Sequence, residues 1–352
     1  MTEHGPLPAI LRPLSLPAER VYRWVIGRRN EAFQARRGVV ELDRPVISVG
    51  NLSVGGTGKT PMVLLLLRML RARGAWPCVA MRGYAQQRGL SDEASEYRVA
   101  FPDLPMVVQA NRIEGLLSLF ASEQGARADC VVLDDGFQHR QIARQLDIVL
   151  IDATRDPFAD RLLPAGWMRE PVENLQRAHA VVLTHAEVVE PRHLDSLRAR
   201  LERVVRAGTP ILTASHEWAS LAISSARTSA LETPEWLRSR RPLACCAIGN
   251  PGAFLAQARR HTQVTAQVVL RDHDPYGPTT VRRIREMLAS RNADTLLVTR
   301  KDWTKLSRFE WPVPVAVPNL EFRVDSSPLS SLLDSVMAKA GSDAHSQDPL
   351  GA

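Results

Sequence analysis

The sequence predicts an α/β protein, with a doubly wound, mostly parallel sheet and a second, smaller α/β domain. One indication is a succession of short apolar runs that alternate with helical patterns, because strands buried on both faces of a parallel sheet are apolar throughout. The other is a glycine-rich loop between an apolar run and a leucine-rich helix, in residues 45–61 (PVISVGNLSVGGTGKTP). Strand, glycine loop and helix in this order are typical of a P-loop, so the expected fold is that of a P-loop NTPase.

The composition is that of a globular protein with one large core or two smaller ones, since 45% of its 352 residues are hydrophobic. The chain has 45 Lys and Arg against 38 Asp and Glu, and the resulting charge of +7 favours acidic partners such as nucleotides, anionic lipid or nucleic acid. The four cysteines lack metal-ligand spacing and indicate buried thiols in a reducing compartment. We expect neither a membrane-spanning segment nor a signal peptide.

Residues 1–37 are expected to carry a helix that begins near Pro17. Apolar and aromatic residues, among them Trp24, are interleaved with arginines such as Arg23 and Arg28. A helix of this composition either lies in a membrane interface, with arginines near anionic headgroups, or packs on the protein's own core. The pattern alone leaves both possibilities open.

The glycine loop is the predicted nucleotide-binding segment. Its glycines let backbone N–H groups converge on phosphate oxygens, and the N-terminus of the following helix favours the same anion. In a P-loop the lysine reaches the β- and γ-phosphates and the next hydroxyl holds Mg²⁺, which are the roles we expect for Lys59 and Thr60. The alternative is a glycine turn without a ligand. The segment consists of Ser53, where the P-loop pattern has glycine, and of Val54, Gly55, Gly56, Thr57, Gly58, Lys59 and Thr60.

Further apolar runs define the domains. In the P-loop core, residues 38–212, strands are expected near 46–49, 78–81, 106–108, 130–133, 148–151, 180–184 and 210–212. The pattern loosens over residues 213–241, where we place the inter-domain connection. Strands near 244–248, 265–270, 295–299 and 314–317 form the smaller C-terminal domain, residues 242–337. The small, polar residues of 338–352 are typical of a disordered tail.

A polar motif, LDDGFQHR, follows the apolar run at 130–133. Asp134 ends that strand as the Walker B carboxylate does in P-loop enzymes, where it binds Mg²⁺. The alternative is a strand-end turn in which the aspartate caps a helix. Asp135 is expected to point elsewhere, and Gln138 and His139 continue the polar loop.

Other polar residues are expected near the same sheet edge or in the smaller domain. Asp92 and Glu93 fall in a polar loop after the second strand, where adjacent carboxylates are common on any surface. Arg169, followed by Glu170, lies in the loop LLPAGWMREP and could meet a phosphate. In the smaller domain, two aspartates flank His273, and such carboxylates can orient an imidazole or raise its pKa.

Taken together, these motifs resemble a family. GNLSVGGTGKTP, RGY, DE at 92–93, LDDGFQHR, LLPAG..REP, GNP, DH and T.KD recur in this order in the tetraacyldisaccharide 4′-kinases, the lipid A kinases of Gram-negative envelope synthesis. The resemblance spans roughly residues 14–306. It implies ATP and Mg²⁺ as cofactors, a lipid A disaccharide precursor as acceptor, and phosphoryl transfer to its 4′-hydroxyl.

The resemblance also bears on the N-terminal helix and on catalysis. In the family a basic, apolar N-terminal helix lies on the cytoplasmic face of the inner membrane, which favours peripheral or monotopic contact of residues 1–37 with the anionic inner-membrane surface. Asp92 takes the role of catalytic base, with His273 as its partner from a second domain that closes over the nucleotide. Lys59 completes the catalytic set, and Asp135 or His139 would be the next candidate base.

The sequence departs from the family pattern on the acceptor side more than in the ATP-binding motifs. The departures are Ala85 and Gln86 after RGY, Ser91 and Ala94 around DE, Asp274 after DH, and Arg300 within T.KD.

Two other functions compete with a lipid kinase. Thr299-Arg300-Lys301-Asp302 follows an apolar run and loosely resembles the guanine-reading loop of a GTP-binding switch or metallochaperone GTPase. A P-loop kinase of a soluble small molecule is the second alternative. No nucleic-acid partner is expected, because the basic residues are spread out without an aromatic-basic reading surface.

Overall fold

The computed structural model describes residues 6, 13–83, 92–225 and 229–345, and the chain forms two compact units. The P-loop unit comprises Thr2–Ala214 and Val324–Ala352, and the smaller unit comprises Ser215–Arg323. None of the described helices is both long enough and apolar enough to cross a bilayer. The four cysteines are buried as free thiols, as the sequence predicts.

The P-loop unit is built on a parallel sheet with the strand order β3-β2-β4-β1-β5-β6-β7. In the register of this sheet, Val49 lies opposite Asp134, and Asn51 lies opposite Leu150. The carboxyl ends of the central strands therefore meet where the glycine loop begins. The strands are β1 (Val46–Asn51), β2 (Pro77–Met81), β3 (Met106–Val108), β4 (Cys130–Asp134), β5 (Leu146–Asp152), β6 (Ala180–Thr184) and the start of β7 (Ile211–Ser224).

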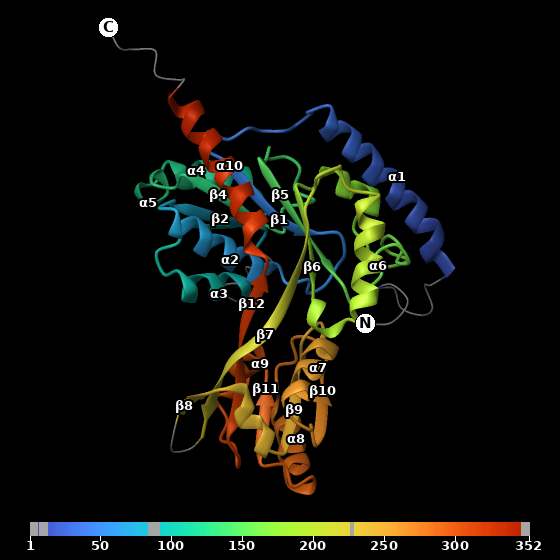
Figure 1. The fold of residues 1–352 in the computed structure, drawn as a ribbon, viewed down its shortest axis with the longest axis vertical. Coiled ribbons are helices and arrows are strands. Elements are labelled where there is room, and N and C mark those ends of the chain that lie inside the picture. The colour runs from blue at the N-terminus through green and yellow to red at the C-terminus, as the bar shows by residue number, and fades with distance from the viewer. Residues whose placement is uncertain (1–5, 7–12, 84–91, 226–228, 346–352) are drawn as a thin grey trace. The chain divides into compact units, whose positions relative to one another are not determined.

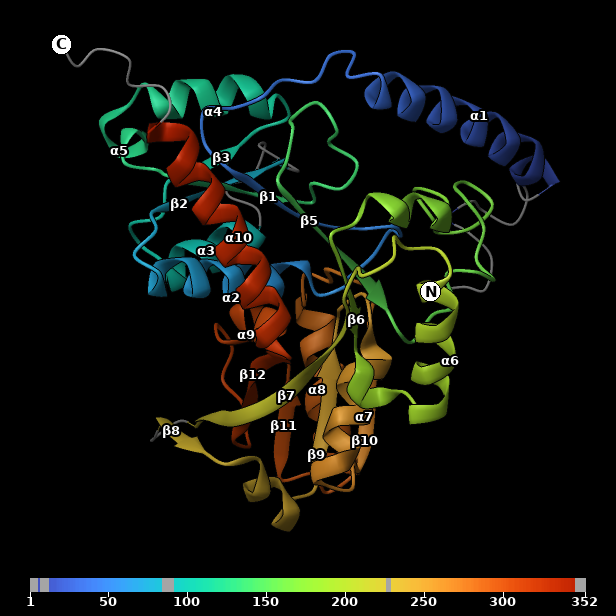
Figure 2. The same ribbon diagram turned by 45° about the horizontal axis from the view of Figure 1, so that its top comes forward.

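Helices flank this sheet, and α1 lies at the outside of the unit (Figures 1 and 2). The sheet is buried on both sides, which explains why its strands are apolar without alternation. Helix α2 packs through apolar residues spaced three or four apart, including Met62, Leu66 and Leu70. The helices are α1 (Ser15–Gln34), α2 (Lys59–Ala72), α3 (Asp92–Ala100), α4 (Arg112–Phe120), α5 (Glu123–Ala126), α6 (Pro191–Glu202), α10 (Ser326–His345) and the short 3₁₀ helices Val172–Arg177 and Ala186–Val188.

The smaller unit has its own parallel sheet and core. Its strand order is β10-β9-β11-β12, and β8 pairs antiparallel with β7 at Leu221 to Ser224. Asn250 caps α7, which begins at Pro251, so the GNP motif marks the start of a helix. The elements are β8 (Ser229–Glu232), a 3₁₀ helix (Pro234–Ser239), β9 (Pro242–Cys246), α7 (Pro251–His261), β10 (Ala266–Val269), α8 (Pro278–Ser290), β11 (Thr295–Val298), α9 (Arg300–Leu306) and β12 (Val315–Val324).

The α/β fold with a doubly wound sheet is as predicted, but three local expectations differ from the structure. Residues 213–241 are largely ordered rather than a loose connection, because Trp218, Leu221 and Ile223 of the long strand β7 are buried in the smaller unit. Helix α10 extends beyond residue 338 into the expected tail, and residues 346–352 lie outside the described part. Asp92 and Glu93 belong to the first turn of α3 rather than to a loop.

The departures at Ala85, Gln86 and Ser91 fall in residues 84–91, outside the described part of the chain. Ala94 is buried in α3.

Candidate active site

The loop between β1 and α2 has the backbone that a phosphate-binding loop needs. Gly58 caps α2 with φ +80°, a left-handed conformation that residues with a Cβ rarely adopt. Gly55 also has a positive φ, +124°. A Cβ added at Gly56 would meet no described atom within 4 Å, so one side of the loop is open. The loop can therefore accept a phosphate at the N-terminus of α2.

The loop is held by the segment around Arg169. The amide of Val54 donates to the Trp167 carbonyl at 2.8 Å, and the amide of Arg169 donates to the Leu52 carbonyl at 2.6 Å. The Asn51 side-chain amide donates to the Ser53 carbonyl at 2.7 Å. The motifs GNLSVGG and LLPAGWMREP thus form one connected structure.

Asp135 gathers two cations beside the loop. Its carboxylate accepts hydrogen bonds from Arg169 at 2.8 Å and lies 3.6 Å from Lys59 Nζ. Burial raises the pKa of Asp135, but the charges of Lys59 and Arg169 outweigh it and hold the pKa below its usual range. Lys59 also donates to Asn51 Oδ1 at 3.3 Å. Asp135 therefore points to the lysine of the loop, and Arg169, expected near a phosphate, contacts Asp135.

Asp134 is a buried carboxylate, and one of its two oxygens lacks a hydrogen-bond partner among the described residues. It is 5% exposed, and Tyr97 donates to its Oδ2 at 2.9 Å, whereas its Oδ1 has no hydrogen-bond partner among the described residues. Burial raises the pKa of Asp134, and Lys59 and Tyr97 partly oppose that rise. Thr60, in the first turn of α2, lies close to the Tyr97 hydroxyl and acts to lower the pKa of this tyrosine, so both predicted metal ligands lie near Tyr97.

These oxygen atoms fit a hard divalent cation. An unpaired buried carboxylate oxygen requires a partner, and Mg²⁺ is usually held by one or two carboxylates together with substrate phosphates. The described residues contain no group of three or more His, Cys, Asp or Glu that could hold a metal ion. The donor set at Asp134 and Thr60 therefore suits an ion that shares its ligands with a nucleotide.

The polar loop after β4 is fixed by an arginine. Arg144 donates to the carbonyls of Gly136 and His139 at 2.8 and 2.7 Å. Gln138 donates to the Asn51 carbonyl at 2.9 Å, which ties this loop to the glycine loop. Burial, together with nearby arginines, lowers the pKa of His139 to about 4, so its imidazole is neutral at neutral pH.

Glu170 connects the site to α1 rather than to the glycine loop. Its fully buried carboxylate accepts hydrogen bonds from Asn174, Arg177 and Asn30 at 2.6, 3.0 and 3.3 Å. A buried carboxylate with these donors organises the loop that carries Arg169.

The expected base and its partner lie in different units. Asp92 is the first residue of α3 in the P-loop unit. His273 belongs to the smaller unit and follows β10, with an imidazole that is 65% exposed. Their pairing therefore stays a prediction.

Sequence reasoning missed three residues of the site. Tyr97 lies in the unpredicted helix α3, and no motif marks it. The buried Arg112 donates to the Asp135 carbonyl at 3.3 Å, across 23 residues of chain. Asn51 alone had a usable signal, because it adjoins the glycine loop.

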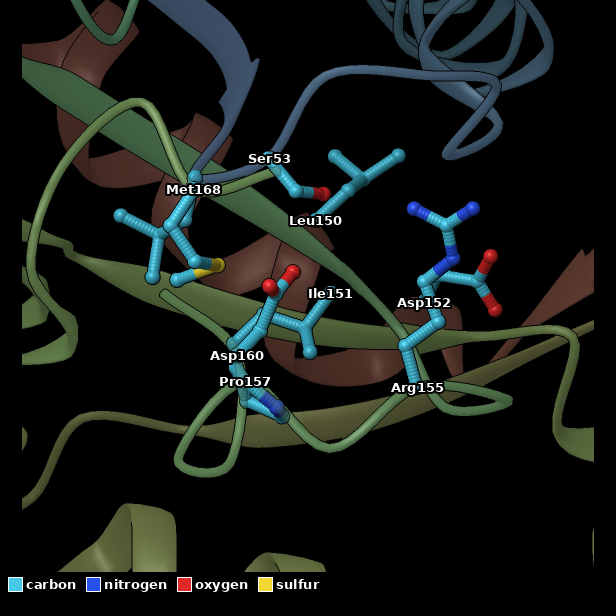
Figure 3. Close-up of a pocket in the computed structure, with 9 residues that line it drawn as sticks. Ser53, Leu150, Ile151, Asp152, Arg155, Pro157, Asp160 and Met168 are labelled. Carbon is cyan, nitrogen blue, oxygen red and sulfur yellow. The ribbon is translucent and has the colours of Figure 1, made fainter. Parts of the chain in front are cut away.

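A recess adjoins the first residue of the glycine loop (Figure 3). Ser53 and Met168 line it together with Asp152, from the end of β5. Asp152 Oδ1 accepts a hydrogen bond from the Thr154 hydroxyl at 2.6 Å and lies 3.1 Å from His185 Nδ1. The carboxylate of Asp152 in this recess is thus already paired with Thr154 and His185.

Helix α1 has an inner face that mixes polar and apolar residues, and it exposes large apolar residues on its outer face. Its inner face packs through Glu19, Tyr22, Ile26 and Asn30; for example, the Tyr22 hydroxyl donates to the Arg169 carbonyl at 2.9 Å. Large apolar residues cover the outer face, with exposures of 63% for Leu14, 48% for Leu16, 63% for Val21, 66% for Trp24 and 47% for Val25. Packing on the protein's own core thus leaves an apolar surface uncovered.

The parallel sheet, the glycine loop on its central strand and the neighbouring carboxylates define a P-loop enzyme of the phosphoryl-transfer class. Comparison with known proteins identifies the family. The family model of tetraacyldisaccharide-1-P 4′-kinase matches residues 9–338, and the chain belongs to this family.

Relatives and a solved structure agree with this assignment. The tetraacyldisaccharide 4′-kinase of Geobacter sulfurreducens is 35% identical over 347 residues, which cover 92% of this chain and 93% of the relative. That of Chlorobium phaeovibrioides is 33% identical over 322 residues, covering 86% and 87%. The crystal structure of "apo" form LpxK from Aquifex aeolicus in complex with ATP matches with a TM-score of 0.68 and 28% identity, covering 93% of this chain and 99% of that one. The predicted family and P-loop kinase fold are confirmed.

Proposed function

We propose that the protein transfers the γ-phosphoryl group of ATP to the 4′-hydroxyl of a tetraacylated glucosamine disaccharide 1-phosphate, in lipid A biosynthesis. The observation that carries the proposal is the loop at Gly58–Lys59 beside Asp134 and Asp135, in a chain of the tetraacyldisaccharide 4′-kinase family. Phosphoryl transfer depends on positioning and charge neutralisation, which such a site can supply.

The nucleotide would occupy the loop formed by residues 53–60. The backbone N–H groups around Gly58 and the ammonium group of Lys59 would bind its phosphates. Because Asp135 already holds Lys59 and Arg169, these two cations would lie beside the transferred γ-phosphoryl group. Thr60 and Asp134 would hold Mg²⁺, which neutralises the developing charge on the phosphates when it is bound.

The acceptor hydroxyl needs a base, since a sugar hydroxyl is a poor nucleophile at neutral pH. Asp134 is the wrong choice, because its carboxylate would be occupied by the metal ion. We assign the role to Asp92 and assign His273 as the group that orients it and stabilises its charge. Residues from different units would pair only when the units close, and closure would exclude water before transfer.

Kinetics test this pair. Asp92→Ala and His273→Ala should each lower kcat strongly with little change in ATP binding, and the double variant should be far less than multiplicatively worse. Retention of most of kcat in both single variants would show that the pair is wrong. His139→Gln and Asp135→Asn would then test the remaining candidate bases.

We further propose that α1 binds the cytoplasmic face of the inner membrane. The exposed apolar residues, with Trp24 among them, lie beside the exposed arginines Arg20, Arg23 and Arg28, and Arg28 stacks over the Trp24 ring at 5.9 Å. Apolar residues would enter the headgroup boundary while arginines meet anionic lipid. Docking of α1 on the loop that carries Arg169 would bring the site close to its lipid acceptor.

The GTPase alternative is disfavoured by the position of Asp302. A guanine-reading loop must present its aspartate to the base, but Asp302 is 1% exposed and accepts hydrogen bonds from Ala247 and Thr299.

Transfer of label from γ-labelled ATP to the tetraacyldisaccharide 1-phosphate in mixed micelles tests the proposed kinase activity. Preference for GTP, or for a water-soluble sugar over the lipid, would overturn it.

A further inference from the structure

The smaller unit contains a buried carboxylate that the reaction does not use directly. Asp302, in the first turn of α9, accepts a hydrogen bond from the Ala247 amide at 3.1 Å on Oδ1 and from the Thr299 hydroxyl at 2.6 Å on Oδ2. The buried hydroxyl of Tyr276 lies close to the same carboxylate and is 3.9 Å from Cys245 Sγ. Three segments of chain therefore meet at one side chain.

Two of these segments lead to the turn that carries His273. Ala247 links the two sides of the arrangement, because its amide donates to Asp302 and its carbonyl accepts a hydrogen bond from the His273 amide at 3.2 Å. Tyr276 closes the turn, and its amide donates to Asp274 Oδ1 at 2.8 Å. Lys305, one turn along α9 from Asp302, donates to the Asp274 carbonyl at 3.1 Å.

The backbone of this turn is strained. His273 and Tyr276 have φ values of +61° and +53°, in the left-handed region that residues with side chains seldom occupy. Such conformations cost free energy and persist only where the surroundings determine them, often at functional sites. The imidazole of His273 is 65% exposed, so the turn presents a solvent-accessible side chain on a fixed backbone.

We propose that Asp302 is a positioning residue, which holds the turn at residues 272–276 through Tyr276 and Ala247 and so sets the place of the His273 imidazole. This inference rests on the proposed role of His273 and explains the T.KD motif as a buttress for that residue. An imidazole presented on a fixed backbone loses little freedom when it meets its partner, which favours a productive geometry.

Tyr276→Phe is the sharpest variant, because it removes one hydroxyl from a buried site without changing the shape of the ring. Asp302→Asn is the second variant, because it replaces one of the two acceptor oxygens of the carboxylate by an NH₂ donor. Thr304→Ala is the matched control: among the described residues, its exposed side chain on α9 donates to the Lys301 carbonyl alone.

Hydrogen exchange of the His273 amide in the full-length protein tests the buttress independently of catalysis. We expect exchange at least about tenfold faster in Tyr276→Phe and Asp302→Asn than in wild type, because exchange follows local opening. Thr304→Ala should exchange at the wild-type rate. Unchanged exchange in both variants would overturn the inference, whatever the role of His273.

Kinetics then connect the buttress to the reaction. Tyr276→Phe should lower kcat about tenfold with an unchanged KM for ATP, and it should cause no further loss in a His273→Ala background, since residues that act as a unit are non-additive. A full multiplicative loss in that background would show that Tyr276 acts elsewhere and would overturn the inference. If His273→Ala itself retains kcat, the proposed function of His273 fails, and the exchange measurement alone decides whether the buttress exists.

Discussion

Tyr97→Phe should change the pH dependence of the kinase more than any other single hydroxyl deletion in the site. Tyr97 and Asp134 are both buried, and their hydrogen bond of 2.9 Å joins a neutral donor to a carboxylate. Hydrogen bonds to charged groups contribute about 1.5–3 kcal/mol, and one pKa unit corresponds to about 1.4 kcal/mol. If Tyr97 favours the ionised carboxylate by that amount, its removal raises the pKa of Asp134 by about 1–2 units.

The sign of the effect follows from the proposed role of Asp134. Its pKa is already raised by burial, and loss of the tyrosine hydroxyl raises it further. The protonated form cannot hold Mg²⁺, so the acidic limb of kcat/KM for Mg-ATP should move to higher pH by about 1–2 units. The profile is measured with saturating lipid acceptor from pH 5 to 9.

Tyr22→Phe is the matched control for this variant. Its hydroxyl donates to a neutral carbonyl, that of Arg169, at the same distance of 2.9 Å. It should lower the free energy of unfolding by about 0.5–1.5 kcal/mol and leave the acidic limb in place. An acidic limb that coincides in wild type and Tyr97→Phe would refute the placement of the metal ion on Asp134.

Three other predictions concern Lys59, helix α1 and His139. Lys59→Ala should lower kcat by about 10²–10³, because a positioned charge that stabilises the transition state is lost, and an activity near that of wild type would exclude the P-loop assignment. The double variant Val21→Glu/Trp24→Glu should weaken flotation with anionic vesicles at least about tenfold, because burying each apolar side chain contributes about 1.5–3 kcal/mol. Leu117, exposed on α4, provides the control, and Leu117→Glu should leave flotation unchanged. Burial lowers the pKa of His139 to about 4, so its neutral form contributes stability that is present above the unfolded pKa of about 6.5 and is lost as pH falls toward 4. His139→Gln should therefore reduce the fall in the free energy of unfolding, measured with urea, between pH 7 and pH 5. An unchanged slope would contradict this.

The local sequence pattern was sufficient to predict the main sheet and the glycine loop. The strands from β1 to β6 are continuous apolar runs, and Gly58-Lys59-Thr60 marks the start of α2, so neither depends on distant residues. Helix α3 was missed because its nine residues, DEASEYRVA, carry little apolar periodicity. Strand β7 was predicted too short because its buried positions change phase between Trp218 and Leu221, so no single alternation marks the whole strand.

The contacts that organise the site could not be predicted, because they join residues far apart in the chain. Tyr97 reaches Asp134 across 37 positions, and Arg169 reaches Asp135 across 34. Helix α1 is the most instructive case. Its composition left membrane and core packing open, and the structure shows that the packed face includes polar residues, with Glu19 and Asn30 buried beside Ile26.

The position of the transferred phosphate is the most direct test of the proposed reaction. Purified protein is incubated with ATP, Mg²⁺ and tetraacyldisaccharide 1-phosphate, and the product is assigned by phosphorus–proton correlation NMR, with Lys59→Ala incubated for the same time as the control. We expect a new phosphomonoester coupled to the proton at carbon 4′ with wild type, and far less of it with the variant. A phosphate on another hydroxyl, or ATP hydrolysis without a phosphorylated lipid, would contradict the account.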